Sequence, residues 1–575
     1  MLSKFEIRLL DLLPSATSNS DNAPIRCQSR VVPLSANESF EALSYVWGTE
    51  PNFTKISLDG NDVLITSSLA AALRRARLPG TTRVLWADQL SINQFDDQEK
   101  ANQVPLMTHI YTKTTQCLIW LGEMKPDISL SDAQSALDLI HHLSDPEKNK
   151  MSDLSLEKNL HRSIHALDSI SMTENKWWTR TWTLQESILP SKACVLWGPL
   201  TIQWETLASA GSNWVNSPHD LVLDPYLDNL NNLFTQTNGI LFSKRQHGGP
   251  LEITFRWGFR WATNPLDKVY GLLGLFPTGG FTRVRKCNYQ LQPATVYAMF
   301  TVDLIEHHKT LHPLALKFLQ RPGSRMPGLP SWGLDLSDGN QKKEEVRVDR
   351  DDYIWYMKNT YDCYVASGKT EVNSTRLQYD QNSNTLRLTG IVIDDIAVAV
   401  PQPTEDVPGT SNITCAGVPR LVQEWYQIAE GFYTNPEWLH LSWQASFWRG
   451  LLGNLTLGGE NEPRAQATQE DVALAQRFVE FGERNSICPS LFASISHRKM
   501  IITATGLLGF APHDADVGDQ VWILHGGRMP FVLRAKDGLP RPKNEYILIG
   551  ASYVHEIMDG RAADHAKSSC EIVLN

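Results

Sequence analysis

Apolar and polar positions in the first 200 residues alternate between strand-like runs and helix-like periods. Residues 67–76, for example, repeat apolar positions every three or four residues and stop before Pro79-Gly80, as a helix does. A second helical period begins near Asp96, and Pro105 inside it should kink or break that helix. Strands that alternate with helices predict an α/β fold with a parallel sheet. The expected strands are residues 41–48, 62–65, 83–88, 116–122 and 193–198.

Residues 171–186 are rich in tryptophan and end in a glutamate. If Ser171 and Glu174 form a capping box, a helix starts there and places Trp178, Trp182 and Glu186 on one face. A carboxylate flanked by indoles is partly desolvated, which raises its pKa and suits it to general-base or charge-stabilising chemistry. The same spacing is also typical of a tryptophan core with a solvated or arginine-paired glutamate.

The pattern of apolar and polar positions changes twice in the rest of the chain. Helical periods dominate the middle, and residues with period-two alternation dominate the end, where a helical segment interrupts them. This order predicts a β-barrel or sandwich with a helical insertion. Dense charge in residues 337–352 indicates a solvated linker. The expected division is 1–215 for the α/β domain, 216–345 for a mainly helical region and 346–575 for the β-rich domain, with its insertion at about 417–485.

Composition excludes several classes of protein. The 575 residues carry a formal net charge of −10, which argues against a general nucleic-acid-binding surface. The N-terminus lacks the apolar core of a signal peptide, and no apolar run approaches the ~20 residues that span a bilayer. The eight cysteines include no C-x-x-C pair, which fits reduced thiols and excludes common zinc motifs. We therefore expect a cytoplasmic protein without a membrane span.

Ligands of parallel sheets bind at the carboxyl ends of the strands, so the loops there supply candidate binding residues. Trp47 and Gly48 end the first expected strand, Asp88 ends a later one, and Asn93 lies in the loop that follows it. With Glu186 these residues would form a polar cleft. Structural roles are open alternatives: Asp88 as a helix N-cap, Asn93 as a loop-ordering side chain, and Gly48 as a turn residue.

Motifs of other chemistries are missing. The sequence contains no G-x-S-x-G elbow, Walker A sequence, G-x-G-x-x-G or H-E-x-x-H. The pairs His141-His142 and His307-His308 lie on expected helices, where adjacent side chains diverge and do not share a metal. We therefore expect neither a metal site nor a bound cofactor.

Three ordered blocks, at residues 40–48, 85–94 and 180–186, resemble the fungal heterokaryon incompatibility (HET) domain family. Segments that accompany this domain in full-length family members are also present, including residues 267–275, 329–332, 447–449 and 553–560. The three blocks are Phe40-Glu41-Ala42-Leu43-Ser44-Tyr45-Val46-Trp47-Gly48, Leu85-Trp86-Ala87-Asp88-Gln89-Leu90-Ser91-Ile92-Asn93-Gln94, and Arg180-Thr181-Trp182-Thr183-Leu184-Gln185-Glu186.

The resemblance implies a role in non-self recognition and regulated cell death when incompatible fungal cells fuse. It also implies a distant likeness to Toll/interleukin-1 receptor (TIR) domains and hence a flavodoxin-like sheet. Some TIR domains cleave NAD+ with a glutamate that follows a tryptophan by four positions, as Glu186 follows Trp182. The implied catalytic residue is then Glu186. Trp182 and Trp178 would line the binding site on the nicotinamide side, and Asp88 and Asn93 would bind the substrate.

The resemblance leaves a second hypothesis open, in which a non-catalytic TIR-like module assembles or recruits a partner to signal death. Under the first hypothesis NAD+ is the substrate, whereas the second hypothesis involves no NAD+. Under both, the partners expected are further copies of the chain and an incompatibility partner protein.

Overall fold

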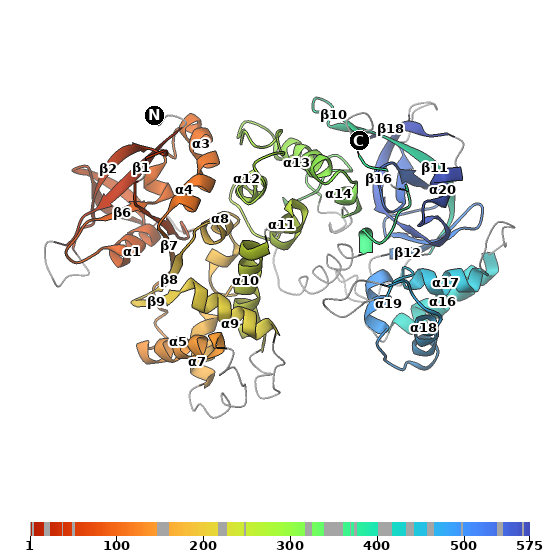
Figure 1. Ribbon diagram of the computed structural model, residues 1–575, viewed down its shortest axis with the longest axis horizontal. Helices are drawn as coiled ribbons and strands as arrows, with labels where there is room; N and C mark the ends of the chain where they lie inside the picture. Colours follow the sequence, from red (N-terminus) through yellow and green to blue (C-terminus); the bar gives the residue numbers. More distant parts are fainter. Residues whose placement is uncertain are drawn as a thin grey trace. The chain divides into compact units, whose positions relative to one another are not determined.

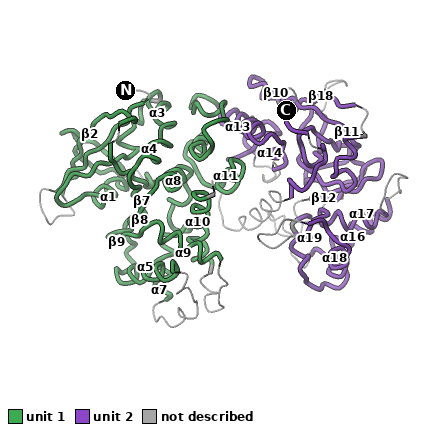
Figure 2. The backbone as a smooth tube through the Cα atoms, viewed as in Figure 1, with its two compact units in different colours: residues 1–291 green, residues 292–575 purple. Residues whose placement is uncertain are grey.

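A computed structural model of the 575-residue chain contains two compact units, residues 1–291 and 292–575 (Figure 2). The division into three regions expected from the sequence stays a prediction. The structure describes all residues except 1, 3–4, 16–22, 37, 49–51, 146–159, 217–226, 247–248, 317–324, 338–359, 369, 373–376, 401–416, 433–441, 457–464, 496–497, 537–543 and 566–567. Most of the expected charged linker, residues 337–352, therefore lies outside the described residues.

The first unit is built on a mixed sheet (Figure 1). Its strand order is β5-β4-β2-β1-β6-β3-β7-β8-β9. Its centre, β6-β3-β7-β8, is parallel, whereas β1 and β9 pair antiparallel with β6 and β8. The strands are β1 (Glu6–Leu12), β2 (Arg26–Pro33), β3 (Glu41–Ser44), β4 (Phe53–Leu58), β5 (Asn61–Thr66), β6 (Arg83–Trp86), β7 (Gln116–Gly122), β8 (Ala193–Trp197) and β9 (Leu200–Gln203).

The central strands are apolar on both faces because helices cover both sides of the sheet. In β7, residues 117–121 are all buried, the continuous pattern expected of an internal parallel strand. Helix α1 (Ser67–Ala76) covers one face, and Leu69 and Leu73 are fully buried against β7 and β4. Thr66 caps this helix by accepting a hydrogen bond from the Leu69 amide at 3.3 Å.

The region around Pro105 is broken, as the sequence predicts. Helix α2 (Asp88–Ser91) is a single turn, and α3 (Asp97–Gln103) ends where a 3-10 turn at Val104–Leu106 begins. Helix α4 (Met107–Lys113) then continues. Proline has no amide hydrogen to donate, so the α-helical bonding pattern is interrupted at this point.

The single helix expected over residues 171–186 is wrong. The Ser171 hydroxyl accepts a hydrogen bond from Thr173, and Asn175 caps a 3-10 turn, η2 (Lys176–Thr179), in its place. Arg180 is extended, and a short helix, α8 (Thr183–Ile188), begins only after Trp182. Trp178 and Glu186 therefore do not lie on one helix.

Further helices complete the first unit. Helix α9 packs against α5 and α10, and α8 contacts α4, α10 and α12. The helices are α5 (Leu130–Ser144), α7 (Leu160–Asp168), α9 (Trp204–Asn216), α10 (Leu227–Gln246), α11 (Pro250–Trp257) and α12 (Asp267–Leu273).

The second unit is an antiparallel sheet that curls on itself, with one parallel pair, β16 and β18. Strand β14 pairs with both β15 and the long β11, which closes the path β14-β15-β16-β18-β11 into a ring. Its strands are β10 (Leu377–Asp380), β11 (Thr385–Val400), β12 (Arg498–Thr503), β13 (Leu508–Pro512), β14 (Gln520–Leu524), β15 (Phe531–Ala535), β16 (Glu545–Ala551), β17 (Tyr553–Val554) and β18 (Cys570–Leu574).

Helices surround and interrupt this second sheet. Those between β11 and β12 form the insertion expected from the sequence pattern, and their bounds extend from residue 418 to 495. The helices are α13 (Pro293–His308), α14 (His312–Ala315), α16 (Val418–Phe432), α17 (Trp443–Leu451), α18 (Gln469–Phe481), α19 (Cys488–Ile495) and α20 (Arg561–His565).

The mixed α/β character of the N-terminal region and the strands of the C-terminal region are thus confirmed. No helix in the described part of the chain has the length and apolarity needed to cross a membrane.

Candidate functional site

Glu186 is buried at the carboxyl end of β3. It lies on α8, is only 6% exposed, and its Oε2 is hydrogen-bonded to the Ser44 hydroxyl at the last position of β3. The Trp177 indole donates to the same hydroxyl at 2.8 Å. Residues from β3, η2 and α8 are therefore joined by one hydrogen-bonded chain, which holds the carboxyl group beside the strand tip.

Burial changes the charge of this carboxyl group. Desolvation, followed by the nearby charge of Asp88, raises the pKa of Glu186 from 4.5 to about 8. The Ser44 hydrogen bond and the cations Arg180 and Arg260 act in the opposite direction. At neutral pH the group is mainly protonated, and it ionises close to pH 8, the range in which a general base is useful.

Asp88 and Trp47 are brought together as the sequence predicts. The Trp47 indole donates to Asp88 Oδ2 at 2.9 Å. Burial raises the pKa of Asp88, although the hydrogen bond from Trp47 and the charge of Arg180 oppose this. The buried Tyr45 hydroxyl lies beside the same carboxylate but not in good hydrogen-bonding geometry. Asp88 is the first residue of α2, and the N-cap is Ala87, so the alternative of Asp88 as the N-cap is wrong.

A segment far along the chain fixes the start of α8. The fully buried Arg260 donates from Nη1 to the Thr183 hydroxyl at 2.9 Å and to the Arg180 carbonyl at 3.3 Å. Its guanidinium lies 4.6 Å from the centre of the Trp257 ring. Lys268 in turn donates to the Arg260 carbonyl. The end of α11 and the start of α12 therefore hold the segment that carries Glu186.

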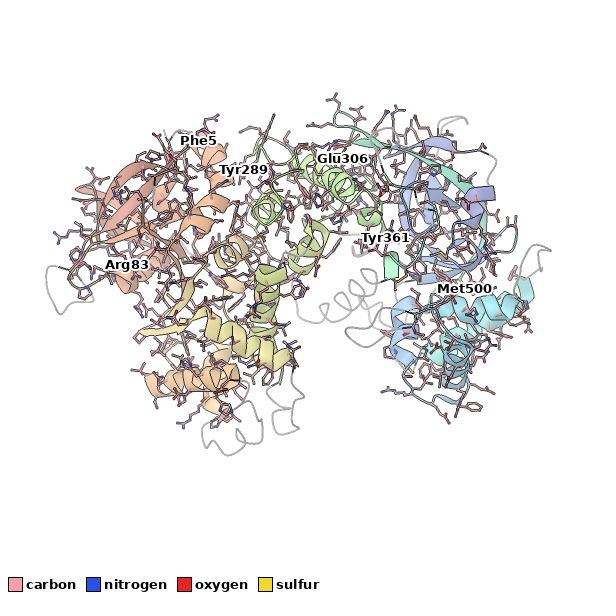
Figure 3. The ribbon with its side chains drawn as sticks, in the orientation of Figure 1. Phe5, Arg83, Tyr289, Glu306, Tyr361 and Met500 are labelled. Carbon is pink, nitrogen blue, oxygen red and sulfur yellow. The ribbon has the colours of Figure 1, made fainter. Side chains whose placement is uncertain are left out.

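A third acidic side chain, Asp267, lies near Trp182. Its Oδ1 accepts a hydrogen bond from Tyr289 at 2.7 Å, and the half-buried Trp182 indole lies beside it. Burial raises the pKa of Asp267, while Tyr289, Trp182 and the charge of Arg180 lower it. Tyr289 is marked in Figure 3. Arg180 is thus within electrostatic reach of Glu186, Asp88 and Asp267.

Three predicted site residues lie apart from this cluster or serve the backbone. Trp178 is fully buried, donates to the Ile170 carbonyl at 2.6 Å and packs on Trp177 and Trp204, so its indole has no surface for a ligand. The exposed Asn93 accepts from the Phe95 amide at 3.1 Å and orders its own loop. Gly48 is exposed with a φ of 85°, which glycine adopts without strain.

Sequence reasoning missed Ser44, Trp177 and Arg260. Ser44 and Trp177 lie in segments that drew attention, but their contact joins positions 133 residues apart, and nothing local indicates it. Arg260 follows Phe255-Arg256-Trp257, a helical stretch whose aromatic and basic residues could have marked a packed cation.

A groove opens at the carboxyl ends of β3 and β7. It has a volume of about 180 Å³ and is lined by Val46, Ser68, Trp120, Leu121, Gly122 and residues 174–176. Glu186 does not line it. The groove nevertheless adjoins the cluster, because residue 176 precedes Trp177 and Val46 lies two positions after Ser44. The described residues contain no group of three or more His, Cys, Asp or Glu side chains placed to hold a metal ion.

Two segments of the chain match known protein families. Residues 40–186, which contain the whole cluster except its Arg260 and Asp267 side, match the family model "Heterokaryon incompatibility protein (HET)". Residues 482–570, in the second unit, match the "Het-6 beta-barrel domain". Residues 40–186 are therefore similar to the HET family, and residues 482–570 are similar to the Het-6 barrel domain.

One relative matches along almost the whole chain. The chain is 24% identical over 685 aligned positions to "Heterokaryon incompatibility protein 6, OR allele" of Neurospora crassa, and the alignment covers 98% of this chain and 95% of that protein. No solved structure matches. The likeness to TIR domains stays a prediction.

Proposed function

We propose that this chain acts in heterokaryon incompatibility, as a protein of fungal non-self recognition that triggers regulated cell death. Two findings support this role. The HET family model matches the part of the chain that holds Ser44, Asp88 and Glu186. The relative that aligns with 98% of the chain bears the name of a heterokaryon incompatibility protein.

We further propose that the first unit cleaves NAD+ and that Glu186 carries the reaction. The observation that carries this proposal is the buried Glu186 carboxyl, hydrogen-bonded to Ser44 at the end of β3. Strand order supports it: numbered along the chain, the four parallel strands lie in the order 2-1-3-4, as in flavodoxin-like sheets, and α8 comes between the third and fourth.

The chemistry requires the ionised form of Glu186. The bond between nicotinamide and ribose breaks, the electron pair leaves with nicotinamide, and water adds to the oxocarbenium-like ribose carbon with loss of a proton. An adjacent carboxylate stabilises the positive centre and can accept that proton. Half-buried Trp182 is the candidate for stacking on the ring, whereas buried Trp178 is not. Because Glu186 is 6% exposed, residues that cover it must move before substrate reaches it.

The same low exposure favours the second candidate, a non-catalytic assembly module. In that case the protonated Glu186 is a structural hydrogen-bonding partner of Ser44, and the domain signals death by binding further copies or a partner protein. A buried carboxyl with a satisfied hydrogen bond serves either role.

One substitution separates the two functions. We would express the full chain with Glu186→Gln in fungal cells and measure NAD+ content and viability. The enzyme predicts that both NAD+ loss and death disappear, because the amide cannot stabilise the positive centre. The assembly module predicts that death persists without NAD+ loss in either protein.

The matched control is Glu205→Gln. Glu205 is an exposed residue of α9, so the same chemical change there should leave NAD+ loss and viability as in the wild type. Purified wild-type protein should also cleave NAD+ faster as the pH rises toward 8, and an unchanged rate over pH 6 to 9 would argue against Glu186 as the ionising group.

A further inference from the structure

We propose that the groove at the carboxyl ends of β3 and β7 binds the adenylate half of the dinucleotide, with its phosphate at Lys176. This inference rests on the proposed cleavage of NAD+ and deepens it by assigning a second binding position.

The groove lies where the direction of the chain's connections changes. Strand β3 is first along the chain among the four parallel strands, and its neighbours β6 and β7 are second and third. The point between the first and third strands is the switch point at which ligands of such sheets bind. Val46 follows β3, and Trp120, Leu121 and Gly122 end β7, so the groove occupies this point.

Part of the groove's lining lies on the α1 side of the strand tips, away from Glu186. Ser44 contacts Glu186 and Trp177, whereas the next residue, Tyr45, packs into the core that α1 forms against the sheet. Ser68 of α1 and Trp120, a member of that same core, line the groove. A two-ended ligand that crosses the strand tips would reach the groove with one end and the Glu186 side with the other.

The polar groups of the groove favour an anionic ligand. Among the described residues, the exposed Lys176 ammonium forms no ion pair and the Ser68 hydroxyl makes no hydrogen bond. Glu174 is neutralised by Lys125, whose Nζ lies 2.6 Å from Oε2. Lys176 therefore leaves the groove with a net positive charge, and a phosphate is the group of a dinucleotide that complements it.

The floor of the groove accepts a flat, weakly polar ring. Val46, Trp120 and Leu121 supply apolar atoms, and the Asn175 side chain is occupied by the Leu121 carbonyl at 2.6 Å and the Trp177 amide at 3.0 Å. Gly122 has a φ of 103°, and a Cβ there would have no neighbour within 4 Å, so the space above it is open. Adenine fits such a surface through its edges and its apolar face.

Size assigns one half of the dinucleotide to the groove. Its volume of about 180 Å³ is below the roughly 300–1,000 Å³ of pockets that enclose whole drug-sized ligands. The nicotinamide half must place its ribose at Glu186, which does not line the groove. The adenylate half is the part that remains.

Calorimetric titration of the purified full-length protein tests this assignment, with AMP, nicotinamide mononucleotide and inorganic phosphate as probes. AMP should bind with one site per chain and compete with NAD+, more tightly than either other probe. Lys176→Gln should weaken AMP binding about tenfold through the lost ion pair. Ser68→Phe fills the groove and should abolish binding. Lys55→Gln, a matched loss of charge on the β4–β5 hairpin, should leave it unchanged.

The outcomes separate this inference from catalysis. AMP binding by both wild type and Glu186→Gln supports the groove, whether or not NAD+ is cleaved. The assignment is overturned by absent AMP binding, by equal binding of AMP and phosphate, or by binding that Lys176→Gln and Ser68→Phe leave unchanged while thermal unfolding shows both variants folded. Absent AMP binding in a protein that still cleaves NAD+ overturns the groove alone.

Discussion

At the scale of single residues, the cluster around Glu186 combines burial with charge. Glu186 is protonated at neutral pH because desolvation outweighs the cations around it. Arg180 and Arg260 lie near enough to lower its pKa, so ionisation near pH 8 is accessible without removing the group from the protein interior. The same balance that would make Glu186 a base also makes the folded state sensitive to pH.

Stability should therefore fall as pH rises. Glu186 has a pKa of about 8 in the folded chain and 4.5 when unperturbed, so the folded state binds more protons between these values. The contribution of this shift to the free energy of unfolding is at most roughly 5 kcal/mol. It is fully present below pH 4.5 and is lost as pH rises through 8. Urea denaturation of wild type and Glu186→Gln from pH 5 to 9 measures it. The two proteins should diverge with pH, and parallel curves would contradict the shift.

Removing Arg260 should destabilise the first unit. Arg260→Met removes the guanidinium that donates to the Arg180 carbonyl and to the buried Thr183 hydroxyl. The free energy of unfolding should fall by about 2–4 kcal/mol. Arg245→Met, on an exposed position of α10, is the control and should change stability by less than about 0.5 kcal/mol. Denaturant midpoints compare the two, and equal losses would remove the special role of Arg260.

At the scale of elements, α8 is held in place by its partners more than by its own length. It is a helix of six residues, all buried, and a helix this short is not stable alone. Gln185 donates to the Gly271 carbonyl at 2.9 Å, which joins α8 to α12. The expected long helix over residues 171–186 fails for this reason: Asn175 capping and the pairing of Arg180 with Trp261 satisfy the backbone differently.

A methyl group on Gly271 should push α12 away from the segment that precedes α8. A Cβ there would lie 2.7 Å from Thr181 Cγ2, a methyl group on a constrained backbone. Overpacking costs about 1–3 kcal/mol, more than the roughly 1 kcal/mol that alanine gains over glycine in a helix. Gly271→Ala should therefore lower stability and NAD+ cleavage together.

Gly279→Ala is the matched control for this change, because a Cβ at Gly279 meets no atom within 4 Å. Thermal unfolding and an NAD+ assay on both variants check the prediction. A Gly271→Ala protein that is more stable than wild type would show that propensity, not packing, decides at this position.

At the scale of the whole molecule, the first compact unit ends at residue 291, well beyond the matched HET segment that ends at residue 186. Helix α10 completes its core: Leu233 and Phe234 are fully buried, and Asn231 accepts a hydrogen bond from Trp214 of α9 at 2.7 Å. The segment with Arg260 adjoins α10, because the Trp257 indole donates to the Ser243 hydroxyl at 3.1 Å. The HET motifs therefore need later residues to reach their arrangement.

Truncation should reveal this dependence. A chain of residues 1–215 loses α10–α12 and leaves α8 without Arg260. It also exposes apolar side chains whose burial stabilises the fold by about 1.5–3 kcal/mol each. We expect it to be insoluble or rapidly digested by protease, whereas residues 1–291 should resist digestion. Equal resistance of the two fragments would show that α10–α12 are dispensable.

The sequence by itself determined the local features that depend on neighbouring residues. Period and capping predicted most strands and α1, Pro105 predicted the broken helix, and strand-end positions predicted that Trp47 and Asp88 lie in one cluster. Family motifs also located the HET domain. Such features follow from steric and hydrogen-bonding preferences that act within a few residues.

Only the tertiary structure decided which distant groups meet. Ser44 and Glu186 are 142 positions apart, and Arg260 meets Thr183 across 77. These contacts set the pKa of Glu186 and the residue at which α8 starts. They also decide that Trp178 is fully buried whereas Trp182 is half-buried. Each depends on desolvation and on hydrogen bonds between elements, and these arise only when the sheet and helices pack, so no local pattern encodes them.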